Sequence, residues 1–244
     1  MRHDDRMVSP RTRGTYPEAF AALARSLAEA RGLRPTIEQI VARSVDIVPC
    51  DWAAIAVAEK MGDRPPGLAA TTDTGLMGTV AEIAGRIGVS PGLTAFSEGA
   101  KVYCPDLAAP STWAAYASEM VQRTPIRSVL SFGLRLHDHP LGVLTFYSAA
   151  AGGFDEDAQR RGSLLADHAT VAIDAATSAE SADSLKAALE SSRVIGAAMG
   201  VLAERHAITT DEAFDLLRLV SNRTNRKISD LAEEFISRGE LPEP

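Results

Sequence analysis

The sequence predicts an α+β domain and a small all-α domain that are joined by a long helix. Three observations predict this arrangement. Helix patterns flank five or six short strands within a region of about 150 residues, which is typical of an α+β fold. An almost unbroken helix pattern follows from residue 157 to about residue 205. The last fifty residues hold three helix patterns with very short breaks, and the first of them completes the long helix.

The composition is that of an ordinary globular protein. The 244 residues are 45% hydrophobic and 23% charged, and their formal net charge is −7. No apolar run approaches 18 residues, so we expect no membrane span. Two cysteines, Cys50 and Cys104, argue against a disulfide scaffold and fit a reducing cytoplasm. Residues 1–14 are charged and lack an apolar core, so we expect a disordered tail and not a signal peptide.

The first domain is expected to alternate helices with short strands. Apolar residues at helical spacing predict helices at 17–31, 36–48, 76–87 and 113–122. Short apolar or alternating runs predict strands at 52–58, 68–72, 101–104, 128–136 and 140–147. The last two strands flank His137-Asp138-His139, which we expect at the tip of a hairpin. Residues 88–99 predict a loop with one helical turn, and a long helix is expected to begin near Glu156.

The sequence gives little support for catalysis. It has no phosphate-binding loop of the G-x-x-x-x-G-K-[ST] type, no H-E-x-x-H and no paired C-x-x-C, so we expect no enzyme activity. His137 and His139 could ligate a metal, but a solvated turn is the favoured interpretation and no metal is expected. Cys104 is interpreted as a packed strand residue. Asp51 and Asp106 are hypothesised to line a cavity in this domain.

The connector between the two domains favours a paired helix. Residues 176–192 are rich in Ala and Ser. Positions 182, 185, 189, 192, 196, 199 and 203 step alternately by three and four, and they include Leu185, Leu189 and Met199. A period of 3.5 residues predicts a two-stranded coiled coil, and therefore a homodimer. A flexible linker is the alternative.

The last two helix patterns have clear boundaries. Thr209 or Thr210, followed by two acids, predicts the start of the first of them. A polar run over 221–225 predicts its end. The final helix is expected to be capped with the help of Ser229 and Asp230 and to stop at Gly239.

The region between these two helices is strongly basic. Residues 218–227 hold three arginines and one lysine and no acid, so the segment carries a charge of +4 in an acidic chain. Such a cluster is a candidate site for several phosphates. A solvated basic turn is the alternative interpretation.

The carboxyl-terminal residues carry a resemblance to a known family. The segment resembles an ANTAR domain, a three-helix RNA-binding module of bacterial transcription antiterminators. The matching runs are Ile195-Gly196, Gly200-Val201-Leu202, Asp211-Glu212-Ala213-Phe214, Thr224-Asn225-Arg226-Lys227 and Asp230-Leu231-Ala232-Glu233. Met199 stands where the family often has Lys, and Ala203 where it often has Met. The resemblance implies binding to a pair of RNA stem-loops with hexanucleotide loops.

The first domain resembles a GAF domain, a small-molecule-sensing relative of the PAS domain. The clearest segment is VLSFGLRLHDHPLGVLTFYS. Related domains often carry Gly-Glu-Gly-Pro-Cys where this chain has Gly88-Val89-Ser90-Pro91-Gly92, so attachment of a cofactor through that Cys is excluded. The resemblances imply a GAF domain over residues 15–175 and an ANTAR domain over 193–240. The disordered tail expected over 1–14 precedes them, and the connector over 176–192 joins them. A GAF ligand, if one exists, is unidentified.

The exposed polar residues of the basic region are the candidate RNA contacts. Arginine and amide side chains suit the loops of folded RNA. The candidates are Arg205, Arg218, Asn222, Arg223, Asn225, Arg226 and Lys227. Phe214 could stack on a base, although its spacing from Leu217 favours a core position. Two alternatives remain, a ligand sensor that works through protein contacts and a DNA-binding helix-turn-helix regulator, although no DNA partner is expected.

Overall fold

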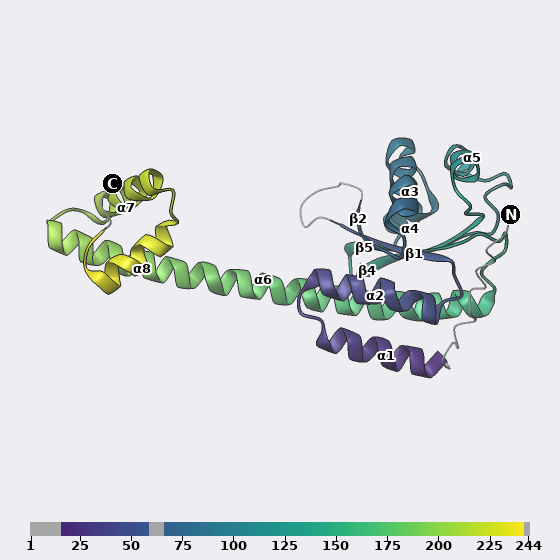
Figure 1. Ribbon diagram of the computed structural model, residues 1–244, viewed down its shortest axis with the longest axis horizontal. Coiled ribbons are helices and arrows are strands. Elements are labelled where there is room, and N and C mark those ends of the chain that lie inside the picture. The colour runs from purple at the N-terminus through teal and green to yellow at the C-terminus, as the bar shows by residue number, and fades with distance from the viewer. Residues whose placement is uncertain (1–15, 59–65, 242–244) are drawn as a thin grey trace, which may run out of the picture. The chain divides into compact units, whose positions relative to one another are not determined.

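The computed structural model describes residues 16–58 and 66–241 (Figure 1). The tail predicted for residues 1–14 and most of the segment between the strands predicted at 52–58 and 68–72 lie outside the described residues. The chain divides into two structural units, the first ending at Ser178 and the second beginning at Ala179. Each unit has its own core and is described by itself.

The first unit is built on an antiparallel sheet of five strands in the order β2-β1-β5-β4-β3. The strands are β1 (Trp52–Val57), β2 (Gly67–Thr71), β3 (Lys101–Cys104), β4 (Ser128–Leu136) and β5 (His139–Ser148). Strands β4 and β5 form the predicted hairpin, paired from Ser128↔Ser148 to Leu136↔His139. Its tip includes His137, whose φ of 51° lies in the left-handed region.

Helices cover both faces of the sheet (Figure 1). The helices of this unit are α1 (Tyr16–Glu29), α2 (Leu33–Ile47), α3 (Thr74–Ile87), α4 (Pro91–Glu98), α5 (Ala114–Arg123) and the first part of α6 (Glu156–His206). Helices α1, α2 and α6 lie on one side, and α3, α4 and α5 lie on the other.

Each face of the sheet has its own hydrophobic core. Alternate residues of a strand point to opposite faces. Ile55 and Phe146 therefore pack in the core under α1, α2 and α6. Their neighbours Ala54 and Tyr147 pack in the core under α3 and α5. The structure thus confirms the α+β fold, with helices on both sides of an antiparallel sheet.

Helix α4 differs from the predicted loop with one turn. It runs for eight residues, from Pro91 to Glu98. The Ser90 hydroxyl accepts a hydrogen bond from the Leu93 amide at 3.2 Å, and Gly99 ends the helix at a φ of 63°. Gly133 of β4 passes directly beneath it, where an added Cβ would collide with the Ala95 carbonyl.

The second unit is a three-helix arrangement made by the end of α6, α7 (Thr210–Thr224) and α8 (Ile228–Arg238). Six buried residues form its core: Ala198, Leu202, Ala213, Leu217, Ala232 and Phe235. Thr209 is the N-cap of α7, as predicted. Its hydroxyl accepts from the Glu212 amide at 3.2 Å, and the Glu212 carboxylate accepts from the Thr209 amide at 2.8 Å. The Thr209 amide and the Thr209 hydroxyl both donate to the Glu212 carboxylate, and these two hydrogen bonds lower the pKa of Glu212.

Candidate functional sites

The junction between α7 and α8 is a tight turn that is stabilised by a left-handed residue and by two hydrogen bonds. Asn225 ends α7 in the left-handed conformation, with φ 51° and ψ 40°. The Ser221 hydroxyl donates to the Arg226 carbonyl at 2.5 Å, and the Arg226 amide donates to the Ser221 carbonyl at 3.2 Å. Helix α8 then begins after Lys227, which provides no side-chain cap. The predicted capping by Ser229 and Asp230 is wrong, because the Ser229 hydroxyl donates to the Asp230 carboxylate instead.

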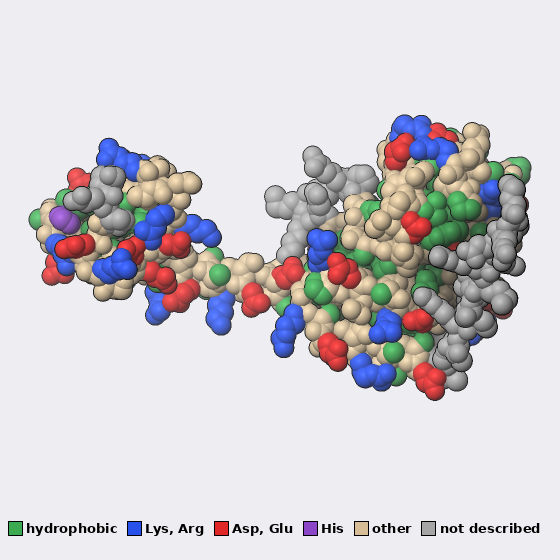
Figure 2. Space-filling view, viewed as in Figure 1, with side chains coloured by type: hydrophobic (Ala, Val, Ile, Leu, Met, Phe, Trp, Pro, Cys, Tyr) green, Lys and Arg blue, Asp and Glu red, His purple; other side chains and the backbone are tan. Residues whose placement is uncertain are grey.

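All seven candidate RNA contacts are exposed, but two of the cations have acid partners. Arg218 pairs with Asp215 at 2.8 Å on the same helix. Arg226 pairs with Glu234 of α8 at 2.7 Å, and this contact is the main cause of the lowered pKa of Glu234. In the described part of the chain, Arg223 and Lys227 have no ion-pair partner. Figure 2 shows blue and red side chains interspersed over this unit, in agreement with this partial pairing.

The seven candidates divide into two groups. One group lies along a single face of α7 and its C-cap, because its members are spaced by four and three residues: Arg218, Asn222 and Asn225. Arg223 lies on another face, where it borders a groove of about 600 Å³ together with Arg205 and the half-exposed Leu219.

Arg205 also has a structural role in the second unit. Its guanidinium lies 5.6 Å from the centroid of the Phe235 ring and donates a hydrogen bond to the Gly239 carbonyl, which follows the end of α8. Phe214, for which the spacing favours a core position, is instead 36% exposed, on the same face as Arg218.

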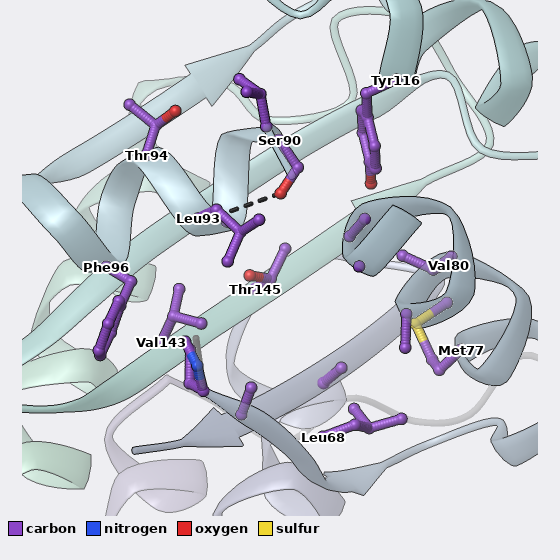
Figure 3. Close-up of a pocket in the computed structure, with 18 of the residues that line it drawn as sticks. Leu68, Met77, Val80, Ser90, Leu93, Thr94, Phe96, Tyr116, Val143 and Thr145 are labelled. Atoms are coloured by element: carbon purple, nitrogen blue, oxygen red, sulfur yellow. Dashed lines mark hydrogen bonds between the residues drawn. The ribbon is translucent and has the colours of Figure 1, made fainter. Parts of the chain in front are cut away.

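The first unit contains a cavity of about 580 Å³ between α3, α4 and the sheet. Figure 3 shows its lining. The side chains come mainly from α3, α4, β1 and β5. They include Met77, Val80, Leu93, Phe96, Val143 and, among polar groups, Ser90, Thr94, Tyr116, Thr145 and Tyr147. No Asp, Glu, Lys, Arg or His is among the described residues that line it.

The hypothesis that Asp51 and Asp106 line this cavity is wrong. The Asp51 carboxylate accepts hydrogen bonds from the Ser148 hydroxyl at 3.0 Å and the Ala149 amide at 2.8 Å, at the end of β5. The Asp106 carboxylate accepts from the Ala108 amide at 2.8 Å in the loop after β3. Both acids therefore fix local turns outside the cavity lining.

The Gly88–Gly92 segment forms part of the cavity wall. Gly88, Val89, Ser90 and Gly92 all line it. The positions at which related domains often carry Glu and Cys are thus held here by Val89 and Gly92, and neither brings a charge or a thiol to the cavity.

In the described residues, no group of three or more His, Cys, Asp or Glu side chains is placed to hold a metal ion. Within the same residues, no helix combines the length and the apolar character that crossing a bilayer requires.

The protein thus combines a cavity-bearing α+β domain with a domain of three helices that carries an exposed basic junction. A GAF domain model matches residues 30–174, and an ANTAR domain model matches residues 183–236. The chain therefore belongs to the GAF–ANTAR regulators. Both domain types are regulatory.

Solved structures resemble the fold of the first unit. The GAF domain from a phosphoenolpyruvate-protein phosphotransferase of Coxiella burnetii is 14% identical, with a TM-score of 0.50 over 68% of this chain and 96% of that one. The phytochrome photosensory core module of Stigmatella aurantiaca is 11% identical, with a TM-score of 0.54 over 84% of this chain and 44% of that one. At these identities the likeness concerns the fold alone. A comparison with curated protein sequences finds no match.

Proposed function

We propose that this protein is an RNA-binding regulator of transcription antitermination, whose ANTAR domain binds paired stem-loops in nascent mRNA under the control of its GAF domain. The observation that carries the proposal is the exposed basic junction of the ANTAR domain, where Arg223 and Lys227 lack an acid partner among the described residues. Such cations can replace the counterions of RNA phosphates. We place this activity in the cytoplasm, where nascent transcripts are made.

The polar face of α7 supports recognition of RNA loops. Asn222 and Asn225 offer amide donors and acceptors beside Arg218, and all three side chains are exposed. Phe214 lies one helical turn before Arg218 with part of its ring exposed, so it can offer a stacking surface. Unstacked loop bases are read by such hydrogen bonds and stacking contacts, whereas base pairs in an RNA duplex are poorly accessible to side chains.

The connector supports a homodimer. Every residue from 178 to 190 is exposed, including Leu185 and Leu189 at 62% and 64%. Leu164 at 40% and Val171 at 64%, earlier in α6, hold the same heptad position as Leu185, which extends the predicted seam toward the GAF domain. Pairing of α6 with a second copy would cover these side chains. The dimer would present two ANTAR domains to the two stem-loops of one transcript.

The continuity of α6 supports control of the ANTAR domain by the GAF domain. One helix of 51 residues supplies both a wall of the GAF core and the first helix of the ANTAR domain. Within a dimer, a change in the register of the two α6 helices would alter the spacing of the ANTAR domains. Binding would then hold the transcript in a form incompatible with its terminator hairpin.

Fluorescence anisotropy with a labelled two-hairpin RNA tests the proposal. The Arg223→Ala/Lys227→Ala variant should bind at least about tenfold more weakly than wild-type near 0.15 M salt. The slope of its log affinity against log salt concentration should decrease by an amount that corresponds to about two phosphate contacts. Arg193→Ala, an exposed cation on α6 that pairs with Glu190, is the control and should bind like wild-type.

Two outcomes would contradict the proposal. One is equal RNA affinity of the double variant and wild-type. The other is tighter binding to duplex DNA than to the two-hairpin RNA, which would favour a DNA-binding regulator. Failure to bind either nucleic acid would favour a sensor that works through protein contacts.

A further inference from the structure

The GAF cavity has an entirely uncharged lining in the part of the chain that the structure describes. Its volume of about 580 Å³ falls in the range of small-molecule sites, of about 300–1,000 Å³. A charged ligand that entered it would lose hydration without meeting an opposite charge, and this transfer is strongly unfavourable. Apolar side chains on three of its sides, including Met77, Leu93 and Val143, favour a ligand with a large apolar surface.

Tyr116 brings an unpartnered hydroxyl to this cavity. Its side chain is buried, with 2% of the residue exposed, and Figure 3 shows the hydroxyl directed toward the space bordered by Val80, Ser90 and Thr145. Among the described residues, no group forms a hydrogen bond with this hydroxyl. By contrast, Thr94 accepts from the Trp113 indole at 3.0 Å, and Thr145 pairs with Ser131 at 3.1 Å. The hydroxyl of a buried tyrosine that is open to a cavity can be satisfied by a ligand.

We infer that this cavity binds an uncharged, largely apolar small molecule whose oxygen or nitrogen acceptor takes a hydrogen bond from the Tyr116 hydroxyl. Such a ligand matches the three features of the cavity: its volume, its neutral lining and the unpartnered hydroxyl of Tyr116. The inference concerns the GAF domain alone and does not depend on RNA binding. It names the class of ligand through which the GAF domain would act in the proposed function.

Helix α3 offers a way to block the cavity without disturbing the core. Gly85 lines the cavity, and a Cβ added there would have no heavy atom within 4 Å. A leucine at this position therefore has space to enter the cavity, and it improves the helix propensity. Gly78 lies two turns earlier on the same helix, is equally open, and does not line the cavity. Gly78→Leu is thus a matched control.

The experiment uses the full-length protein without RNA and the neutral fluorescent ketone 6-propionyl-2-(dimethylamino)naphthalene. Its emission shifts to the blue in an apolar site, and its carbonyl can accept the Tyr116 proton. We expect saturable binding of one probe per chain to wild-type and to Gly78→Leu. Gly85→Leu should bind at least about tenfold more weakly, because the leucine occupies the space that the probe needs.

Two further arms test the polar part of the inference. Tyr116→Phe should weaken probe binding by about fivefold, as expected for the loss of one hydrogen bond. The anionic probe 2-(dimethylamino)naphthalene-6-sulfonate has the same ring system and should bind at least tenfold more weakly than the ketone because the lining is neutral. Circular dichroism and a thermal melt establish that each variant is folded.

Several outcomes would overturn the inference. They are the absence of saturable binding to wild-type, equal affinity of Gly85→Leu and Gly78→Leu, and equal affinity for the ketone and the sulfonate. An unchanged affinity in Tyr116→Phe would refute the role of its hydroxyl. None of these results bears on RNA binding by the ANTAR domain, so the two proposals can fail separately.

Discussion

Arg226 and Glu234 form an ion pair that connects the α7–α8 junction to helix α8, with 2.7 Å between the Nη2 and Oε2 atoms. Glu234 also pairs with Arg238 at 2.6 Å, so one carboxylate holds two guanidinium groups. The basic junction is therefore partly neutralised by an acid that lies seven residues beyond its last cation. This arrangement makes the effective charge of the junction smaller than the +4 of residues 218–227.

Removal of this carboxylate is expected to strengthen RNA binding. Glu234→Gln frees Arg226 and adds one positive charge to the junction, so RNA affinity near 0.1 M salt should rise by about two- to fivefold. Glu233→Gln makes the same change in net charge at an exposed neighbouring position that does not contact Arg226. Anisotropy titrations of the two variants compare them directly. If RNA affinity rises equally in both variants, the change in net charge, and not the release of Arg226, causes the tighter binding.

Arg205 and Arg223 border the same groove but are expected to differ in function. Arg205→Ala removes the contact with Phe235 and the hydrogen bond to Gly239, and should destabilise the ANTAR domain by about 1 kcal/mol. Arg223→Ala should leave the thermal midpoint unchanged and weaken RNA binding by several-fold. Paired thermal melts and anisotropy titrations measure both effects. A stable Arg205→Ala variant with strongly reduced RNA affinity would instead assign Arg205 a direct RNA contact.

The main elements of both domains could be predicted because their patterns are local. The β4–β5 hairpin consists of two largely apolar runs on either side of a polar tip, and α7 begins with a complete capping box at Thr209. Helix α4 was harder to predict because it is only eight residues long and contains Gly92 within its first turn. Its flanking signals, Ser90 followed by Pro91 and a terminal Gly99, were nevertheless present in the sequence.

The sites depended on contacts that the sequence does not specify. The position of Asp51 follows from the pairing of Trp52 with Tyr147, which brings it beside Ser148 and away from the cavity. Likewise, the basic cluster is visible in the sequence, but its pairing with Glu234 requires α8 to fold back on α7. The residues that line the cavity could not be predicted, because they come from separate elements between positions 54 and 147.

Two glycines of α6 are expected to respond in opposite ways to alanine. A Cβ added at Gly162 would lie 2.7 Å from Cε2 of Phe132, in the layer between α6 and the sheet. Gly162→Ala should therefore destabilise the GAF domain by about 1–2 kcal/mol, despite its better helix propensity. Gly200 is exposed and has no heavy atom within 4 Å of an added Cβ, so Gly200→Ala should stabilise the protein by about 1 kcal/mol. Urea denaturation measures both, and a stabilising Gly162→Ala would contradict the packing seen here.

An ion network between α3 and α5 is expected to make the GAF domain sensitive to acid. Arg123 pairs with Glu82 at 3.0 Å and with Glu119 at 3.5 Å, and Arg86 also pairs with Glu119. Arg123 lowers the pKa of Glu82, and Arg86 lowers that of Glu119. Because the folded-state values lie below the ordinary value of 4.5, the network stabilises the fold fully above that pH and loses its effect as the pH falls through the lowered values.

The double variant Glu82→Gln/Glu119→Gln tests this dependence. Its thermal midpoint should lie below that of wild-type at neutral pH, by a small amount because the pairs are exposed to solvent. The difference should shrink toward zero as the pH is lowered through the folded-state pKa values. Glu98→Gln, an exposed carboxylate outside this network, is the control. A difference in midpoint that stays constant from neutral to acid pH would mean that the variant acts through packing and not through ionisation.

The exposed leucines of α6 provide the test of the dimer. Leu185 and Leu189 lie one turn apart and more than 60% exposed, so a coiled coil would bury both at its seam. Leu185→Glu/Leu189→Glu places two like charges on each helix at that seam and should convert the dimer to a 25.9 kDa monomer at micromolar concentration in sedimentation equilibrium. Ser184→Glu/Ala187→Glu adds the same charge to the opposite face of the helix and should leave the dimer intact. A monomeric wild-type, or dissociation by both double variants alike, would contradict a seam at these leucines.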